Sequence, residues 1–456
     1  MTDLNQQRAA FLPLRRDRGT MIKQFTKGVH MRLNTLVVGL ALCGAVIRLS
    51  ACGDDGRGAP DDGTDSGTDS GADGGADSGS DGGVDTDTDT DCLFFVNGGL
   101  SDYSGHDGSS WDLALSSVQD GLDAAAAVAG SCSVWVASGT YTPTEDITGD
   151  PAPSDPRTKT ILLKDGVALY GGFAGEETLL EERDIQTNET ILSGDVGTEG
   201  YDGDNACQVV TGADDALIDG FTVTKGTAIE GCAVISGGGM YNYLTSPTVS
   251  NCNFVNNGAD FMGAGMFNSQ SSPTVVNCAF RENLSGQGGG VFNFEAPALI
   301  SNCIFIGNYA QEGGGIYNYF SSPSITNCTF AGNWTLSEGD GVYSTGAGSV
   351  PTLTNSILWG GDSQIVDVEA MSSVTYCNVQ GGHMGAGNID ADPLFADAAG
   401  GDLHLNDGSP CIDAADGDAA PTFDMDGNAR VDDPDTANTG VGAITYADMG
   451  AYEFQP

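Results

Sequence analysis

The chain has 456 residues and a formal net charge of −47 at neutral pH, because 63 Asp and Glu residues stand against only 16 Lys and Arg. Glycine is unusually frequent, at 68 residues, whereas the 16 prolines are ordinary. This acidity repels phosphate backbones, which excludes nucleic acid as a partner, and it favours solubility. The length suits two or three ordinary domains or one long solenoid.

The start of the chain, residues 1–51, has the parts of an export signal. Arg32 supplies a basic start, an apolar stretch too short to span a membrane stably follows, and small residues precede Cys52. Leu49–Cys52 reads Leu-Ser-Ala-Cys and resembles the lipobox of bacterial lipoproteins, which implies cleavage before Cys52 and a diacylglycerol on its sulfur. We therefore expect an exported protein held by its lipid at the outer membrane or cell surface, with residues 1–30 as an extension ahead of the signal. An ordinary signal or membrane helix with an incidental Cys is the alternative.

Residues 52–91 consist almost entirely of Asp, Gly, Ser, Thr and Ala. Without apolar surface to offset chain entropy, this segment is predicted to be a disordered acidic tether between the lipid and the body of the protein. A calcium site is the alternative, but the segment lacks the fixed glycine and the terminal Glu of an EF-hand loop.

Two motifs alternate through the middle of the chain with a period of 25 or 26 residues. The first runs from a glycine-rich triplet through an aliphatic and an aromatic residue to Asn or Ser, and its copies begin at Gly237, Gly263, Gly288, Gly313 and Gly339. The second ends in Asn-Cys-x-Phe, as in residues 247–254, and fades at residues 351–358. The period is too short for helical hairpins, which need about 33 residues, and the leucine-rich repeat spacing is missing. Three short strands and three turns per lap, as in a parallel β-helix, fit this period.

Within one lap we expect strands over residues 237–242, 248–250 and 252–254, with a turn at 243–247 and a return turn at 256–258. A bend joins the second and third strands at an Asn, a residue that tolerates left-handed backbone. Stacked laps then place five Asn side chains one above another, each able to bond the next: Asn251, Asn277, Asn302, Asn327 and Asn355.

Alternation along each strand predicts which columns face the interior. Two uniform columns are expected inside, one aliphatic and one of Phe with Cys two residues before it: Met240, Met266, Val291, Ile316 and Val342; Phe254, Phe280, Phe305 and Phe330; Cys252, Cys278, Cys303 and Cys328. The variable column between Cys and Phe is expected to point outward: Asn253, Ala279, Ile304 and Thr329.

The pattern Gly-Gly-x-aliphatic followed by Phe-x-x-Asn is similar to polymorphic outer-membrane protein repeats of the pectin-lyase-like superfamily. This resemblance implies an all-β, right-handed parallel β-helix over residues 92–391, with the clear repeats at 237–358. Residues 111–125 resemble the short N-terminal cap helix of such proteins, and residues 134–141 resemble their first strand. Residues 392–456 resemble the C-terminal module called the choice-of-anchor Q domain, through Asp392–Phe395, Gly408–Asp413, Asp424–Asn428 and Asp448–Glu453.

Polysaccharide lyases and hydrolases share the implied fold, so a carbohydrate-active enzyme is one reading. Such lyases use Arg or Lys beside acid-bound calcium, but the repeats offer only Arg281. Gly382-His383-Met384 lacks the Gly-His-Gly of the hydrolases, and His106, His383 and His404 are isolated in the sequence. We therefore expect a non-catalytic module for binding, adhesion or structure, with the enzyme as the alternative.

The candidate binding site is an aromatic column that alternates with the aliphatic one: Tyr241, Phe267, Phe292, Tyr317 and Tyr343. Facing outward, it would form an exposed ladder that stacks sugar rings or docks a surface protein. The alternative is a purely structural ladder that stabilises the sheet. We expect a monomer whose ligand is a polysaccharide or a surface protein.

Export permits oxidation of cysteines. Cys92 and Cys132 each begin a short strand beside the cap helix, and we predict a disulfide between them. Two weaker candidate pairs are Cys207 with Cys232 and Cys377 with Cys411, while the four repeat cysteines are expected to act as small buried hydrophobes. No cofactor is expected unless calcium binds at Asp424, Asp426 and Asn428, where a plain Asp-Gly turn is the favoured interpretation.

Overall fold

The structure, a computed structural model, describes residues 92–456. The predicted signal, the lipidation candidate Cys52 and the tether at residues 52–91 lie outside the described residues. Among the described residues, no helix has the length and apolar character needed to cross a membrane.

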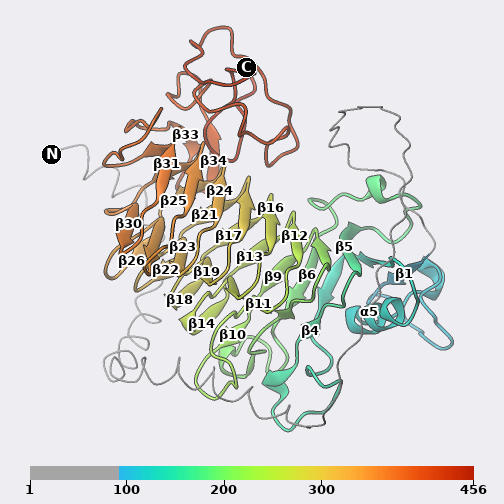
Figure 1. Ribbon diagram of the computed structural model, residues 1–456. Coiled ribbons are helices and arrows are strands. Elements are labelled where there is room, and N and C mark those ends of the chain that lie inside the picture. The colour runs from blue at the N-terminus through green and yellow to red at the C-terminus, as the bar shows by residue number, and fades with distance from the viewer. Residues whose placement is uncertain (1–91) are drawn as a thin grey trace, which may run out of the picture. The chain divides into compact units, whose positions relative to one another are not determined.

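Four parallel sheets are built up lap by lap (Figure 1). Sheet 1 contains β1 (Leu93–Val96), β2 (Ser133–Ala137), β5 (Ala168–Phe173), β8 (Leu217–Asp219), β12 (Thr248–Ser250), β16 (Thr274–Val276), β20 (Leu299–Ser301), β24 (Ser324–Thr326), β28 (Thr352–Thr354) and β31 (Ser373–Thr375). Sheet 2 contains β3 (Gly139–Tyr141), β6 (Thr190–Ser193), β9 (Thr222–Thr224), β13 (Asn253–Val255), β17 (Ala279–Arg281), β21 (Ile304–Ile306), β25 (Thr329–Ala331), β29 (Ile357–Trp359) and β32 (Asn378–Val379).

Sheet 3, which carries the aromatic column, contains β4 (Ile161–Leu162), β7 (Val210–Thr211), β11 (Met240–Tyr243), β15 (Met266–Ser269), β19 (Val291–Phe294), β23 (Ile316–Tyr319), β27 (Val342–Thr345) and β30 (Ile365–Val368). The narrow sheet 4 contains β10 (Thr227–Ala228), β14 (Gly258–Met262), β18 (Leu284–Gln287), β22 (Tyr309–Ala310) and β26 (Trp334–Thr335). An antiparallel pair, β33 (Phe395–Asp397) and β34 (Asp402–Leu405), stands apart from these sheets.

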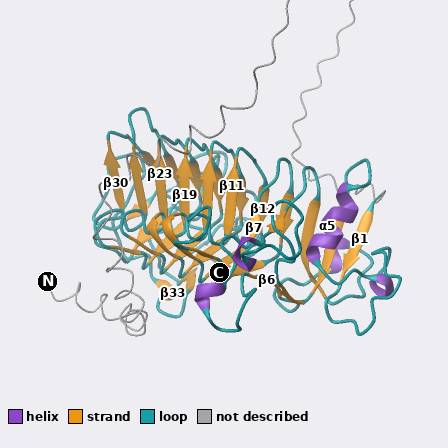
Figure 2. Cartoon of the chain, turned by 90° about the horizontal axis from the view of Figure 1, so that it is seen from below, coloured by secondary structure: helices purple, strands orange, loops and turns teal. Residues whose placement is uncertain are grey.

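Each lap visits the four sheets in turn, as β11, β12, β13 and β14 do before β15 starts the next lap. Met240 of β11 pairs with Met266 of β15, so the register follows the sequence repeat. Successive laps therefore stack in chain order, and the strands of each sheet lie in parallel rows (Figure 2). The predicted parallel β-helix is confirmed.

Two details of the predicted lap are wrong. The return turn after β13 contains a fourth strand, β14, and the glycine triplet precedes the strand of sheet 3 instead of forming part of it. The triplet marks a corner where neighbouring rungs come very close. A Cβ added to Gly290 would lie 2.6 Å from the carbonyl oxygen of Gly315 on the next rung and 2.8 Å from the ring of Phe305. Glycine is needed there because nothing larger fits.

The interior is filled by the uniform columns. Phe254, Phe280, Phe305 and Phe330 are fully buried, and their rings stack with centroids 5.0, 4.9 and 4.6 Å apart. The four repeat cysteines beside this stack are buried free thiols, and burial raises the pKa of the Cys252, Cys278 and Cys303 thiols well above its ordinary value. Thiols held neutral in this way pack as small apolar groups.

Asparagine ladders run along the β-helix. The bend residues have left-handed backbone as expected, with φ between 49° and 54°: Asn251, Asn277, Asn302, Asn327 and Asn355. A second, fully buried ladder lies within sheet 3, where each side-chain amide donates to the next at 2.8–2.9 Å: Asn242, Asn268, Asn293 and Asn318. A third connects Asn257, Asn283, Asn308 and Asn333. These bonds satisfy polar groups that would otherwise be costly to bury.

The N-terminal end is covered by helix α5 (Val118–Ala126). The Ser117 hydroxyl accepts from the Asp120 N–H and caps the helix, and Leu122 is buried against the β-helix. The region expected to be one helix, residues 111–125, is divided between α5 and a 3-10 turn at Trp111–Leu113. Further 3-10 turns lie in loops at Pro156–Thr158, Leu180–Glu182 and Asp202–Asp204.

The C-terminal residues pack on the outer face of sheet 2. The outward column of that sheet does point away from the β-helix interior, yet its members Ala279, Ile304 and Thr329 are buried. Leu403 and Tyr452 pack over Ala279 and Ile304, and the Ala451 N–H donates to the Thr329 hydroxyl. These side chains therefore point away from the β-helix interior without being exposed to solvent.

Candidate functional site

The aromatic column predicted from the sequence forms a continuous stack on the outer face of sheet 3. From Tyr241 to Tyr343, successive ring centroids are 5.4, 5.7, 5.0 and 4.9 Å apart. We call these rings the first aromatic column. They alternate with the interior aliphatic column, as predicted.

The expectation that this column is exposed is wrong for its central members. Phe267, Phe292 and Tyr317 are only 7%, 2% and 6% exposed. Their neighbours cover them, because Met262 from the preceding corner and the rings two residues farther along each strand pack against the stack. Burial also raises the pKa of the Tyr317 hydroxyl, and the nearby Glu312 adds to that effect.

The accessible aromatic surface lies two residues farther along the same strands. Tyr243, Phe294 and Tyr319 are half-buried, and the rings of Phe294 and Tyr319 stack at 5.6 Å. Phe320, at the corner that follows, is 46% exposed and lies 4.5 Å from Tyr319 between ring centroids. We call these four residues the second aromatic column. Ser269 takes the position between Tyr243 and Phe294, so the column is interrupted for one rung.

Amide and carboxylate side chains form pairs on either side of the rings. Gln270 donates to Glu295 at 2.8 Å on the corner side, and Gln287 donates to Glu312 at 3.1 Å on the glycine side. Gln287 also contacts the Tyr317 hydroxyl at 3.4 Å. The face thus combines ring surfaces with hydrogen-bonding groups that are already held in position.

The charge of this face is acidic. Between Arg281 and Arg430 the sequence contains no Lys or Arg, so the later laps of sheet 3 carry no cation of their own. Arg281 itself belongs to β17 of sheet 2, near Tyr452. An anionic ligand would meet uncompensated carboxylates here.

Glu312 and Glu338 occupy matching positions on successive laps, each directly before the first glycine of a triplet. The Gly313 N–H donates to the Glu338 carbonyl oxygen, which confirms that the two positions stack. Both carboxylates act on Tyr343, whose pKa is raised mainly by burial and further by these two charges.

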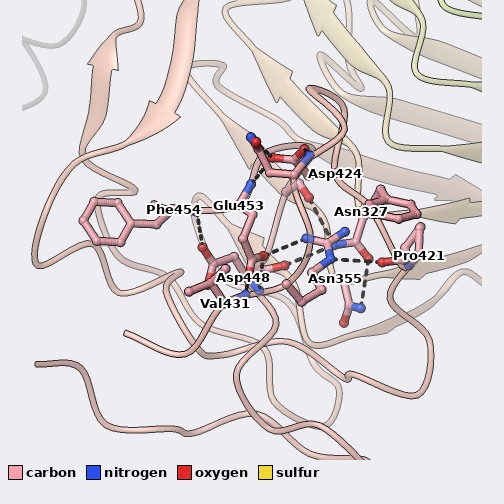
Figure 3. A network of polar contacts seen from close by, with 12 residues as sticks. Asn327, Asn355, Pro421, Asp424, Val431, Asp448, Glu453 and Phe454 are labelled. Carbon is pink, nitrogen blue, oxygen red and sulfur yellow. Dashed lines mark hydrogen bonds and ion pairs between the residues drawn. The ribbon is translucent and has the colours of Figure 1, made fainter. Parts of the chain in front are cut away.

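The C-terminal residues contain a buried polar network (Figure 3). The Arg430 guanidinium donates to the Glu453 carboxylate at 2.8 Å and to the Pro421 carbonyl at 3.0 Å. Only 3% of the Arg430 side chain and none of the Glu453 side chain is exposed. Glu453 also accepts from the backbone N–H groups of Val431 and Asp448, at 2.8 and 3.1 Å. Such a pair fixes the loops that contribute its partners.

Of the three calcium candidates, Asp424 and Asn428 contact each other, because the Asn428 side-chain amide donates to the Asp424 carboxylate at 3.3 Å. Asp424 is buried and accepts from the backbone N–H groups of Asp426, Asn428 and Glu453, at 3.0, 2.7 and 2.9 Å. Asp426 is directed instead at His404, which lies 2.7 Å away. The Asp424 carboxylate thus caps the Asp-Gly turn, and calcium at these three residues stays an untested alternative. No group of three or more His, Cys, Asp or Glu that could hold a metal occurs among residues 92–456.

His404 is not the isolated residue that the sequence indicates. Its two ring nitrogens lie 2.6 Å from Asp402 and 2.7 Å from Asp426, and its ring stacks on Tyr452. Although partial burial works against it, the two carboxylates raise the pKa of His404.

Two disulfides occur among residues 92–456. Cys92 and Cys132 are bridged where β1 and β2 pair in parallel, and Cys207 is bridged to Cys232. The other weak candidates, Cys377 and Cys411, are buried free thiols.

The second aromatic column and the buried Asn ladder of sheet 3 were missed from the sequence. The signal was present, because three strands of sheet 3, β11, β19 and β23, contain the pattern aromatic-Asn-aromatic. Period-two alternation puts both aromatic residues on one face, and the ring nearer the glycine corner is the one that its neighbours cover.

The comparison with protein families agrees with this architecture. The profile of the family described as right handed beta helix region matches residues 209–381. No curated protein matches the sequence. Among solved structures, pectate lyase Pel9A is 15% identical, with 80% of this chain and 97% of that chain covered and a TM-score of 0.37. The tailspike protein gp49 of Acinetobacter baumannii bacteriophage Fri1, a capsular polysaccharide depolymerase, is 11% identical, with 64% and 59% covered and a TM-score of 0.27. The profile match and the stacked parallel sheets together show that the chain folds as a right-handed parallel β-helix.

Proposed function

We propose that this protein is an exported, lipid-anchored β-helix that binds a polysaccharide, without cleaving it, on the outer face of sheet 3. The observation that carries the proposal is the second aromatic column, with accessible rings at Phe294, Tyr319 and Phe320. The apolar faces of sugar rings stack on such aromatic surfaces, which combine a large contact area with rigid geometry.

The paired side chains supply the polar half of the site. Sugar hydroxyls need donors and acceptors at defined positions, and the Gln270–Glu295 and Gln287–Glu312 pairs offer both. Because each pair bridges neighbouring rungs, little side-chain freedom is lost when a ligand binds. The rungs repeat at about 4.8 Å, so an extended chain lying across several laps meets the same kind of group repeatedly.

Charge narrows the ligand class. The later laps of sheet 3 carry the carboxylates of Glu295, Glu312 and Glu338, and the sequence from residue 282 to residue 429 contains no Lys or Arg. These carboxylates disfavour uronic acids and sulfated sugars and favour neutral or amino sugars. The same absence of a cation disfavours lyase chemistry, which needs a basic side chain near the acidic sugar.

The anchor is the second part of the proposal. Its support is the Leu-Ser-Ala-Cys motif that ends at Cys52, followed by the acidic tether at residues 52–91. Like charges extend such a segment, which would hold the β-helix away from the membrane surface. A lipid of this kind anchors more firmly when it carries more than one acyl chain.

A glycan array tests the binding proposal. The wild-type chain, a Phe294→Ser/Tyr319→Ser double variant and a Tyr201→Ser control are compared. Tyr201 is 62% exposed in a loop outside the repeats, so its loss removes an equally accessible ring elsewhere. We expect neutral or amino-sugar glycans to bind wild type and control alike, and the double variant to lose at least tenfold in affinity. Binding of uronate polymers alone, or equal binding by all three proteins, would contradict the proposal.

A glycoside hydrolase is the second candidate, and one observation favours it. Glu312 and Glu338 lie one rung apart beside the aromatic columns, and the rung spacing of about 4.8 Å is close to the carboxylate separation of about 5–5.5 Å in retaining glycosidases. Incubation with the array-selected polysaccharide separates the two functions. New reducing ends that disappear in Glu338→Gln would show hydrolysis, whereas an intact polymer supports binding alone.

A further inference from the structure

The C-terminal residues are hydrogen-bonded to one corner of the β-helix, where the Asn residues of the bends are stacked. Asn327 donates from its side-chain amide to the carbonyl oxygens of Asp448 and Gly450, at 3.0 and 3.1 Å. Asn355 donates to the Asp416 carbonyl at 2.8 Å and accepts from the Asp416 N–H at 2.7 Å. We call the two segments that supply these partners, residues 411–417 and 448–454, the clasp. The Asn ladder, whose amides were predicted to bond one another, thus also bonds the backbone of the clasp (Figure 3).

Asp413 lies inside the clasp, and its carboxylate has no hydrogen-bond partner. The residue is 0% exposed, and both carboxylate oxygens are buried without a partner. Its backbone is fully used: its N–H donates to Asp448 at 2.8 Å, and its carbonyl accepts from the Thr439 and Gly440 N–H groups, at 2.8 and 2.9 Å. A buried ionised carboxylate without hydrogen-bond donors is strongly destabilising, so ionisation of the Asp413 side chain lowers the stability of the folded clasp.

Neighbouring carboxylates further disfavour the ionised form of Asp413. The loop at residues 431–440 brings Asp432 and Asp433, and the second clasp segment brings Asp448 and Glu453. The backbone N–H of Asp433 favours the charged form but lies outside hydrogen-bond geometry. Burial, reinforced by the neighbouring carboxylates, raises the pKa of Asp413 to about 6. Burial, together with the charge of Glu453, also raises the pKa of Asp448.

The nearest cation does not relieve this cluster. Arg430 is buried and paired with Glu453, so one positive charge serves a group of several carboxylates. Asp448 and Glu453 each accept backbone N–H donors on their carboxylates, as ionised acids do. Asp413 differs from both because neither oxygen of its carboxylate accepts a hydrogen bond, so nothing of that kind offsets the cost of ionising it.

We propose that Asp413 is a proton switch that closes the clasp on the β-helix when it is protonated and loosens the clasp when it is ionised. Protonation removes the charge that faces Asp448 and Glu453. The effect reaches the β-helix directly, because the Asp413 N–H holds the Asp448 side chain and the Asp448 carbonyl accepts from Asn327. The switch concerns the attachment of the C-terminal residues and does not depend on what the outer face of sheet 3 binds.

The sign of the pH dependence follows from the direction of the shift. In the unfolded chain Asp413 has its ordinary pKa of 3.8, and in the folded clasp its pKa is about 6. A group whose pKa rises on folding stabilises the folded form fully below the unfolded value, and this stabilisation is lost as the pH rises through the folded value. The clasp should therefore loosen between about pH 4 and pH 6, by roughly tenfold in its opening equilibrium per pH unit.

Hydrogen exchange followed by mass spectrometry on the full chain, corrected for the intrinsic pH dependence of exchange, measures the opening of the clasp. Wild type is compared with Asp413→Asn, which has the shape of the protonated acid but no charge, and with Asp407→Asn, an exposed acid of the same C-terminal region. Peptides covering residues 411–417 and 448–454 report the clasp, and peptides covering β19 and β23 report the β-helix.

We expect Asp413→Asn to protect the clasp peptides at pH 7 by at least tenfold relative to wild type and to flatten the loss of protection between pH 4 and pH 6. Asp407→Asn should behave as wild type, and the β-helix peptides should not change. Equal protection in wild type and Asp413→Asn would overturn the proposal. Weaker protection in Asp413→Asn, together with loosening of wild type by EDTA, would overturn it in favour of a divalent cation at the same carboxylate.

Discussion

Phe292 and Phe294 provide a matched test of which aromatic residues on sheet 3 are structural. Both are Phe, both lie on β19 and both point away from the β-helix interior. Phe292 is 2% exposed and stacks between Phe267 and Tyr317, with centroids 5.7 and 5.0 Å away. Phe294 is half-buried and stacks on Tyr319 alone.

Truncation to Ala should therefore have very different effects at the two positions. Removing a fully buried Phe destabilises a protein by about 3–5 kcal/mol, through lost burial and the cavity left behind. Removing a partly exposed ring with one stacking partner should cost about 1 kcal/mol, since a cross-strand pair contributes roughly 0.2–1 kcal/mol. We expect Phe292→Ala to be destabilised by at least 2 kcal/mol more than Phe294→Ala, a difference of about thirtyfold in the folding equilibrium.

Urea unfolding followed by circular dichroism measures this difference. The unfolding free energy of both variants should depend on urea concentration with the same slope, so that the shift in the unfolding midpoint reports the difference in stability. Equal midpoints for the two variants would refute the assignment of Phe292 to a buried stack and Phe294 to the accessible surface. A larger loss for Phe294→Ala would also remove it as a ligand-binding position that can be mutated without damage to the fold.

Two further predictions concern the buried ladder and the anchor. Asn293→Leu should destabilise the chain by about 2–6 kcal/mol, since it leaves the Asn268 amide and the Asn318 carbonyl oxygen buried without partners, each at a cost of about 1–3 kcal/mol; the same urea titration measures it, and a near-neutral result would show that the ladder is dispensable. Cys52→Ser should release the exported protein from membranes in fractionation, because it removes the sulfur that would carry the lipid; a variant that stays with membranes, beside a wild type that takes up no labelled fatty acid, would contradict the anchor.

The repeated part of the fold follows from the sequence because identical positions recur at a fixed period. Columns such as Phe254, Phe280, Phe305 and Phe330 can be recognised as interior from their uniformity, and the left-handed bends at Asn251 and its equivalents follow from local residue preference. Both depend only on contacts between neighbouring laps, which repeat whenever the sequence does.

Features that depend on contacts outside the repeat could not be predicted from the periodicity of the sequence. The outward column at Ala279 and Ile304 is buried because residues more than 90 positions later cover it, and nothing in the repeat encodes that cover. Phe267 and Phe292 are covered by side chains such as Met262. The residue type at the Met262 position changes from lap to lap, so the repeat pattern does not predict this cover. His404 on β34 and Asp426, which are 22 positions apart, meet only because a later loop folds against that strand.

A crystal structure of the protein with an oligosaccharide from the array tests the central claim most directly. We predict a sugar ring stacked on Phe294 or Tyr319, with its hydroxyls within hydrogen-bond distance of the Gln270–Glu295 or Gln287–Glu312 pair. A ligand bound in a different place, such as the loops at the N-terminal end or the outer face of sheet 1, would contradict the assignment of sheet 3 as the binding face.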